Sequence, residues 1–84
     1  MRPVHPGEIL REEYLAPLGM SAHALSMALH VPARRIRDIV HERRAITSDT
    51  AFRLARYFNT TALFWLNLQR SFDVKHAEDH SSTA

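Results

Sequence analysis

The amino-acid sequence predicts an all-α protein, and three observations support this prediction. Apolar residues recur at the three- and four-residue spacing of a helix, proline and glycine divide the chain into short segments, and no segment has the pattern of a strand. A chain of 84 residues can bury one modest hydrophobic core. We therefore expect a single domain of five helices over residues 1–73, followed by a disordered tail at residues 74–84.

The first two helices are predicted between turn signals. The first lies in "EILREEYLAPLG" and ends at Pro17 and Gly19, and the second lies in "SAHALSMALH" with Ser21 as its N-cap. Their apolar sides comprise Ile9, Leu10 and Tyr14 in the first helix, and Leu25, Ala28 and Leu29 in the second. Each helix is therefore expected to bury one side and expose the other.

The third helix is predicted in "VPARRIRDIV". Pro32 suits the first turn of this helix and also prevents the second helix from running on, so the chain must turn sharply at His30 and Val31. The buried side comprises Ile36, Ile39 and Val40, at the i, i+3, i+4 spacing. The outward residues are then Arg34, Arg37, Asp38 and His41, with Ala33 and Arg35 on the flanks.

Two further helices complete the expected fold. The fourth begins after Thr47 or Ser48, and its regular apolar side comprises Ala51, Leu54, Ala55 and Phe58. The fifth, at about residues 62–73, begins after Thr61 and is apolar most of the way round, so it must be covered on more than one side. We expect a dimerisation surface there, made by Trp65, Leu68 and Phe72; the alternative is a helix buried in the core of a single copy.

The second and third helices have the plan of a DNA-reading helix-turn-helix, at about residues 21–42. A short turn joins them, proline opens the second of the pair, and its free side is basic. In that plan the second helix enters the major groove, and the expected base contacts come from Ala33, Arg34, Arg37, Asp38 and His41. Arg34 and Arg37 suit guanine, because a guanidinium donates to both O6 and N7. Asp38 either pairs with Arg34, four residues earlier, or accepts from a cytosine amino group.

The distribution of charge favours a nucleic-acid partner. The whole chain has a formal net charge of only +2, but between His30 and Arg44 five arginines accompany two acidic residues, a local charge of +3. Contacts to phosphate are expected from Arg35, Arg43 and Arg44, and from the free N–H groups at the helix start capped by Ser21. Such contacts supply affinity without sequence information.

Other kinds of chemistry find little support in the sequence. The absence of cysteine excludes disulfides, thiolate metal sites and cysteine nucleophiles. His76 and His80 are four residues apart, but "HAEDH" departs from H-E-x-x-H and has no third ligand nearby, so we expect no metal. No segment resembles a nucleophile elbow, so we expect neither an enzyme nor a cofactor. No apolar run is long enough to cross a membrane and no export signal precedes the first helix, which favours a cytoplasmic protein.

Several blocks of residues resemble a known family. The segments "HPGEILREEYLAPLGMS", "ALSMALHVP", "RIRDIV" and "FWLNLQRSFD", over about residues 5–73, are similar to HigA-type antitoxins, also called addiction-module antidote proteins. These belong to the lambda-repressor-like (XRE) helix-turn-helix superfamily. The resemblance implies a homodimer that represses its own operon by binding double-stranded operator DNA, and that binds and neutralises a partner toxin, a small mRNA-cleaving ribonuclease. Arg34 and Arg37 match positions that face bases in that family.

The sequence departs from the family pattern at three positions. Ser26 replaces a small alanine and still fits a close contact between helices. His30 replaces the glycine of the turn, and histidine tolerates a positive φ better than most residues. Ala22 replaces a glutamine that touches phosphate in the family, so we expect His23 or the loop arginines to compensate.

Two rival functions stay open at this point. A stand-alone transcriptional regulator would make the same DNA contacts without a toxin, and a toxin-like reading frame beside the gene would distinguish the two. A protein-interaction module would instead use the Trp65 helix as its partner surface and the arginines against an acidic protein. Salt separates this last function from DNA binding, because phosphate contacts weaken steeply with ionic strength and an apolar interface does not.

Overall fold

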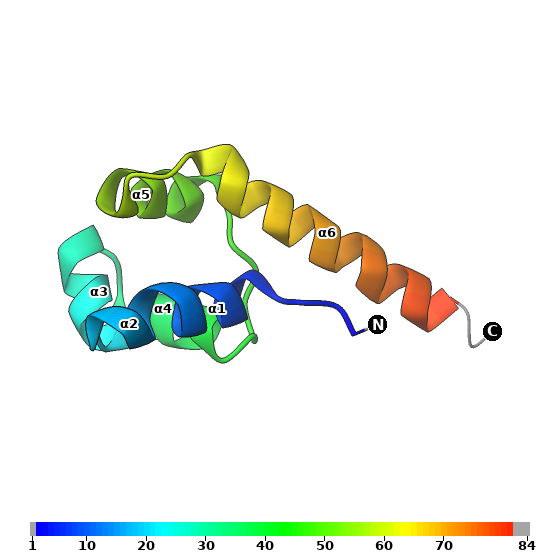
Figure 1. Ribbon diagram of the computed structural model, residues 1–84, viewed down its shortest axis with the longest axis horizontal. Coiled ribbons are helices and arrows are strands. Elements are labelled where there is room, and N and C mark those ends of the chain that lie inside the picture. Colours follow the sequence, from blue (N-terminus) through cyan, green and yellow to red (C-terminus); the bar gives the residue numbers. More distant parts are fainter. Residues whose placement is uncertain (1, 82–84) are drawn as a thin grey trace.

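The structure is a computed structural model that describes residues 2–81, and every regular element in that range is helical (Figure 1). The elements, in chain order, are α1 (Pro6–Ile9), the π-helical segment η1 (Leu10–Leu15), α2 (Ala16–Leu18), α3 (Ala22–Leu29), α4 (Ala33–Val40), α5 (Ser48–Phe58) and α6 (Ala62–Ser81). Since α1, η1 and α2 follow one another without a break, they correspond to the first expected helix. The all-α, five-helix prediction is confirmed.

The first helix contains a feature that its sequence did not reveal. Through η1 the backbone widens, and the N–H of Ala16 donates to the carbonyl of Arg11, five residues earlier. Leu10 and Leu15, also five residues apart, are both buried at the two ends of this segment. In a regular α-helix this spacing would place the two side chains on different sides, so the π-helical turn lets both enter the core.

The capping residues agree with the sequence in most places. The Ser21 Oγ accepts from the N–H of Ala24 at 3.0 Å, and the Thr61 Oγ1 accepts from the N–H of Phe64 at 3.1 Å. Thr47 occupies the cap position of α5 without a side-chain hydrogen bond. His30 adopts the left-handed conformation, with φ of 58°, and ends α3 as expected.

The core lies where α1, η1 and α3 to α5 converge on the first turns of α6. Its fully buried apolar residues are Leu10, Leu25, Ile36, Ile39, Ala51, Leu54 and Trp65. On α3 the expected inward residue Ala28 is exposed, whereas Ser26 is buried and its Oγ donates to the carbonyl of His23. A serine can be buried there because this hydrogen bond satisfies its hydroxyl.

Trp65 is a core residue of the single chain. Its side chain is fully buried, Nε1 donates to the Thr60 Oγ1 at 2.9 Å, and the rings of Tyr14 and Phe64 lie with centroids about 5 Å away. The assignment of Trp65 to a dimer interface is therefore wrong, and the alternative of a helix buried in the core of one copy holds at this position. Leu68 and Phe72 are half-buried and remain predicted contacts of a second copy.

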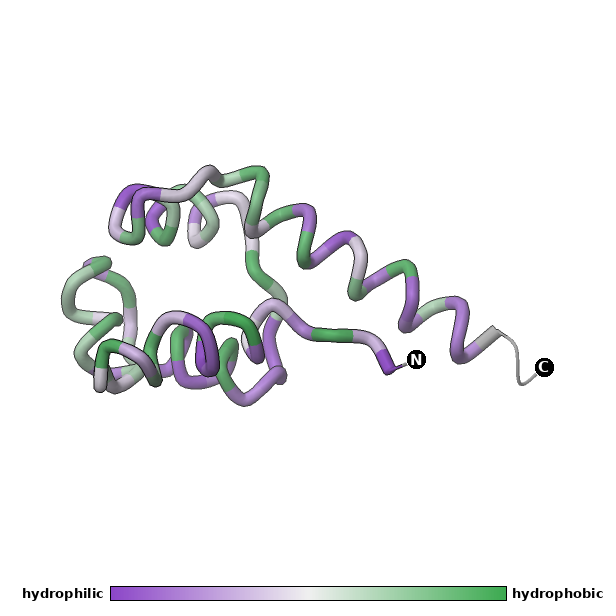
Figure 2. Tube along the Cα trace, in the orientation of Figure 1, coloured by the Kyte–Doolittle hydropathy of each residue, from purple (hydrophilic) through white to green (hydrophobic). Residues whose placement is uncertain are grey.

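Helix α6 is longer than the sequence indicated. It continues to Ser81, so the prediction of a disordered tail from residue 74 is wrong for residues 74–81; residues 82–84 lie outside the described range. Three rings at four-residue spacing accompany the extension: Phe72 stacks on His76 at 5.5 Å, and His76 meets His80 at 4.3 Å. In Figure 1 this distal half of α6 projects away from the other helices, and in Figure 2 hydrophobic and hydrophilic residues are interleaved along it.

Gly7 on α1 packs closely against the backbone of Ile39 on α4. A Cβ added to Gly7 would lie 1.7 Å from the carbonyl oxygen of Ile39, a backbone atom that cannot move aside. We expect Gly7→Ala to lower the free energy of unfolding by about 1–3 kcal/mol, the usual cost of overpacking, in urea denaturation. Gly19 is the matched control, because its left-handed backbone has open space around it and asparagine tolerates that conformation. A Gly7→Ala protein as stable as Gly19→Asn would contradict the close approach.

Candidate nucleic-acid interface

The turn between α3 and α4 is fixed by hydrogen bonds of the backbone. The N–H of His30 donates to the carbonyl of Met27 at 3.3 Å, and that of Val31 to the carbonyl of Ser26 at 3.1 Å. This is the pattern of a helix closed by one left-handed residue, here His30. Pro32 follows in an extended conformation and α4 starts at Ala33, so the two helices meet at a sharp angle that side-chain packing then holds.

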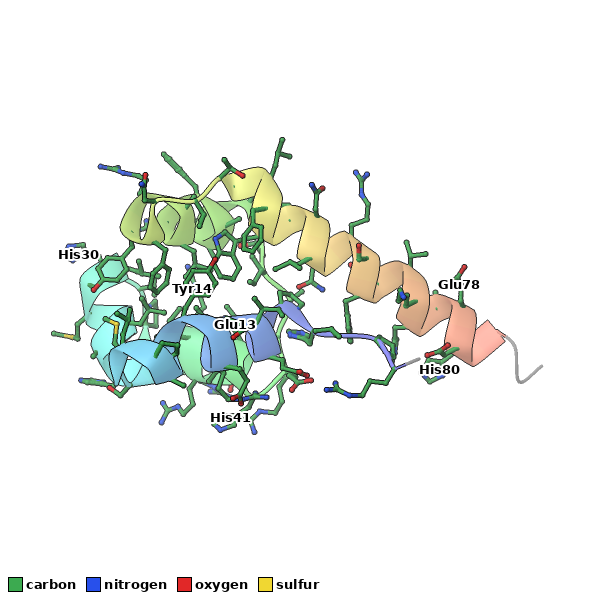
Figure 3. All side chains as sticks on the ribbon, in the orientation of Figure 1. Glu13, Tyr14, His30, His41, Glu78 and His80 are labelled. Carbon is green, nitrogen blue, oxygen red and sulfur yellow. The ribbon has the colours of Figure 1, made fainter. Side chains whose placement is uncertain are left out.

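Helix α4 has one buried and one exposed side, as the sequence predicted. Ile36 and Ile39 are fully buried and Val40 is nearly so. Arg34, Arg37 and His41 are exposed, and the Arg34 side chain retains 82% of its accessible surface. Figure 3 shows His41 on the side of the molecule away from α5 and α6, among side chains with nitrogen tips. The predicted base-reading residues therefore share one accessible surface, with Ala33 and Asp38 half-buried at its edge.

Asp38 is held between two arginines on this surface. Its Oδ2 lies 3.6 Å from the Arg34 Nε, and its Oδ1 accepts from the Arg43 Nη2 at 3.1 Å. The hydrogen bond from Arg43 lowers the pKa of the Asp38 carboxyl below its usual value, and the charges of Arg34 and Arg44 act in the same direction. Asp38 is therefore a carboxylate at neutral pH, and the expected ion pair with Arg34 is present.

The predicted phosphate contacts fall into two groups. Ser21, His23, Arg43 and Arg44 are exposed, and in Figure 2 the first part of the loop that follows α4 is hydrophilic. Arg35, in contrast, is half-buried and its Nη1 donates to the Asp49 Oδ2 at 3.1 Å, at the first turn of α5. Because Asp49 also binds Arg53, Arg35 joins α4 to α5 through a shared carboxylate and is less available than the loop arginines.

Three supporting residues had no signal in the sequence. The Arg53 Nη1 donates to the carbonyl of Leu29 at 2.8 Å and so closes the end of α3. The Arg11 guanidinium donates to the carbonyl of Val40 and lies 3.3 Å from the Glu42 Oε2, so it closes the end of α4. Glu42 itself has a positive φ of 64°. Each contact joins residues more than twenty positions apart, so helical spacing could not have indicated them.

Two other features of the described chain bear on function. Within residues 2–81, histidine, aspartate and glutamate side chains form no group of three or more that could hold a metal ion. No helix in that range combines the length and the apolar character needed to span a bilayer.

The fold and the exposed basic helix define a helix-turn-helix protein, and comparison with known proteins agrees. A family described as "Helix-turn-helix" matches residues 10–66. The chain is 62% identical to virulence-associated protein I of Dichelobacter nodosus over 93% of this chain and 72% of that protein. It is also similar to the structure of Pseudomonas aeruginosa antitoxin HigA with the higBA promoter, at a TM-score of 0.94 and 48% identity, over 98% and 89% of the two chains.

A second structural relative indicates which family of helix-turn-helix proteins the chain belongs to. The structure of an addiction module antidote protein of the HigA family from Coxiella burnetii matches with a TM-score of 0.93 and 49% identity, over 99% of this chain and 90% of that one. The chain therefore belongs to the HigA family of helix-turn-helix antitoxins, and the resemblance found in the sequence is confirmed.

Proposed function

We propose that this protein is a homodimeric, sequence-specific DNA-binding autorepressor and the antitoxin of a toxin–antitoxin pair. The carrying observation is the accessible surface of α4, where Arg34, Arg37 and His41 lie together on a helix whose other side is buried. In the HigA relative from P. aeruginosa the same fold is found with promoter DNA. Two copies of α4 would then read half-sites about 34–36 Å apart, one turn of DNA, or a multiple of that distance.

The roles of individual residues follow from their places. Arg34 and Arg37 would each donate twice to a guanine, with His41 and Ala33 next to them in the groove. Asp38 would hold Arg34 and Arg43 in position. Ser21, His23, Arg43 and Arg44 would meet phosphates along the groove edge. Because operator DNA lies in the cytoplasm, we assign the protein to the cytoplasm. We assign it no catalytic role.

The proposal is tested by fluorescence-anisotropy binding to the DNA upstream of the gene and to a scrambled duplex, each at several salt concentrations. We expect tight binding to the upstream DNA, much weaker binding to the scrambled duplex, and a steep loss of affinity with salt, with a logarithmic slope of about 0.9 per phosphate contact. Equal, weak and salt-sensitive binding to both duplexes, or none, would reject the repressor and favour a protein-interaction module.

The antitoxin half of the proposal needs its own measurement. We expect the protein to bind the product of a short reading frame beside its gene and to suppress that product's cleavage of mRNA. If the neighbouring frame encodes no ribonuclease, or the ribonuclease is unaffected, while operator binding persists, the protein is a stand-alone regulator. Neither result changes the assignment of α4 as the DNA-reading helix.

A further inference from the structure

His5 lies before the first helix and is nevertheless buried, with only 3% of its surface exposed. Its Nδ1 accepts a hydrogen bond from the N–H of Gly7 at 2.9 Å, so the imidazole is the N-cap of α1. The same ring meets the ring of Phe72 on α6 edge-on, with centroids 4.8 Å apart. One side chain therefore starts the first helix and attaches it to the last one.

The helix that His5 starts is seated on the end of α4. Gly7 lies so close to the carbonyl of Ile39 that a Cβ would not fit between them. One turn further on, Arg11 donates to the carbonyl of Val40. The last turn of α4 then closes with the N–H of Glu42 donating to Ile39 at 2.9 Å and that of Arg43 to Asp38 at 2.8 Å. These contacts form a continuous path from Phe72 through His5 and Gly7 to the end of α4.

We propose that His5 is a positioning residue for DNA reading: by capping α1 against Phe72 it sets, through Gly7, the place of the C-terminal turn of α4. That turn carries His41 and leads directly into Arg43 and Arg44, so its displacement would move groove and phosphate contacts together. This inference rests on the proposed DNA binding. The inference adds His5, a buried residue outside the reading surface, to the residues that determine the affinity for operator DNA.

The neutral imidazole is the form that performs this role. A protonated imidazole carries a hydrogen on both nitrogens, so Nδ1 could no longer accept from Gly7. Burial lowers the pKa of His5, whereas the charges of Glu42, after α4, and Asp73, on α6, act in the opposite direction. Because the folded pKa is lowered, the contribution is fully present above the ordinary histidine pKa of about 6.5 and is lost as the pH falls through the folded value.

Three variants separate the cap from the ring contact. His5→Phe keeps a ring against Phe72 and removes the acceptor, His5→Asn keeps a capping oxygen and removes the ring, and Phe72→Leu keeps the cap and weakens its support. His76→Asn is the control, since His76 also contacts the Phe72 ring but is exposed and does not cap α1. The first readout is amide hydrogen exchange of the free protein, which needs no DNA. The second is operator affinity near pH 7.5.

We expect His5→Phe to raise exchange on the order of tenfold at the amides of His41, Glu42 and Arg43, with the core amides of α5 unchanged, and to weaken operator binding several-fold. In His5→Asn both the exchange rates and the operator affinity should stay close to those of the wild type. His76→Asn should change neither the exchange rates nor the affinity. If His5→Phe does not fold, Phe72→Leu is judged by the same local exchange pattern. A uniform rise over all amides, or unchanged exchange at the end of α4, would overturn the inference. Failure of the wild type to select its operator would reject the proposed function and with it the role of His5 in DNA reading, whereas the exchange result would still decide whether His5 positions the end of α4.

Discussion

Replacing Trp65 with alanine is expected to lower the free energy of unfolding by about 3–5 kcal/mol, the range for deleting a large buried aromatic side chain. The Trp65 side chain is fully buried, its Nε1 is bonded to the Thr60 hydroxyl, and its ring contacts come from Tyr14 on η1 and Phe58 on α5. Truncation removes the contacts with η1, with α5 and with Thr60 in the turn before α6 at once. Urea denaturation followed by circular dichroism measures the loss.

Leu63→Ala is the matched control on the same helix. Leu63 is 66% exposed and lies two residues from Trp65, so its truncation should change the free energy of unfolding by less than about 0.5 kcal/mol. If the two variants were equally stable, Trp65 would not be a core residue and the interface assignment would return. Because Trp65→Ala acts on the core, its oligomeric state says nothing about which residues form the dimer.

Replacing Arg34 or Arg37 with alanine is expected to weaken operator binding by about 1–3 kcal/mol in each half-site and to relax selectivity at one base pair there. A homodimer carries each change twice, so the total loss for one substitution is about 2–6 kcal/mol. The physical reason is the exposure of both side chains on α4, where a guanidinium can reach a base edge. Competition between operators with single base-pair changes measures the selectivity.

Arg43→Ala and Arg44→Ala provide the contrast. Both residues are exposed in the loop after α4, and their loss should weaken binding to all duplexes alike and reduce the salt slope by about one for each phosphate contact removed. If Arg34→Ala also affected every duplex equally, the assignment of Arg34 to base reading would be wrong. For Arg35→Ala we expect any loss of affinity to come from a change in the packing of α4 against α5, because Arg35 forms an ion pair with Asp49.

Much of the fold and the reading surface could be predicted from local signals. Helices α3, α4 and α5 follow from short-range spacing and caps, and the outward residues of α4 follow from placing Ile36 and Ile39 inside. The left-handed conformation of His30 followed from the resemblance to HigA-type antitoxins, which have glycine at this position of the turn. This conformation depends on one residue alone. These features depend on residues no more than four or five positions apart, which is the range over which sequence patterns are informative.

The wrong assignment of Trp65 and the missed ion pairs arose because the decisive contacts are distant in sequence. A helix that is apolar all round must be covered, but its sequence does not say whether the cover comes from the same chain or from a second copy. For Trp65 the cover comes partly from Tyr14, more than fifty residues earlier. The pairing of Arg35 with Asp49 and of Arg11 with the end of α4 are likewise tertiary contacts. The extension of α6 was missed because polar residues around His76 hid the four-residue spacing of its rings.

The arrangement of Asp38 between Arg34 and Arg43 has a consequence for the entropy of binding. A long arginine side chain in free solution samples many rotamers, and ordering it on DNA opposes association. Here the carboxylate already restricts two of these side chains in the unbound protein. Exposed ion pairs of this kind are weak enough to be exchanged for a base or a phosphate. Part of the rotamer entropy is therefore lost when the chain folds, and less remains to be lost when DNA binds.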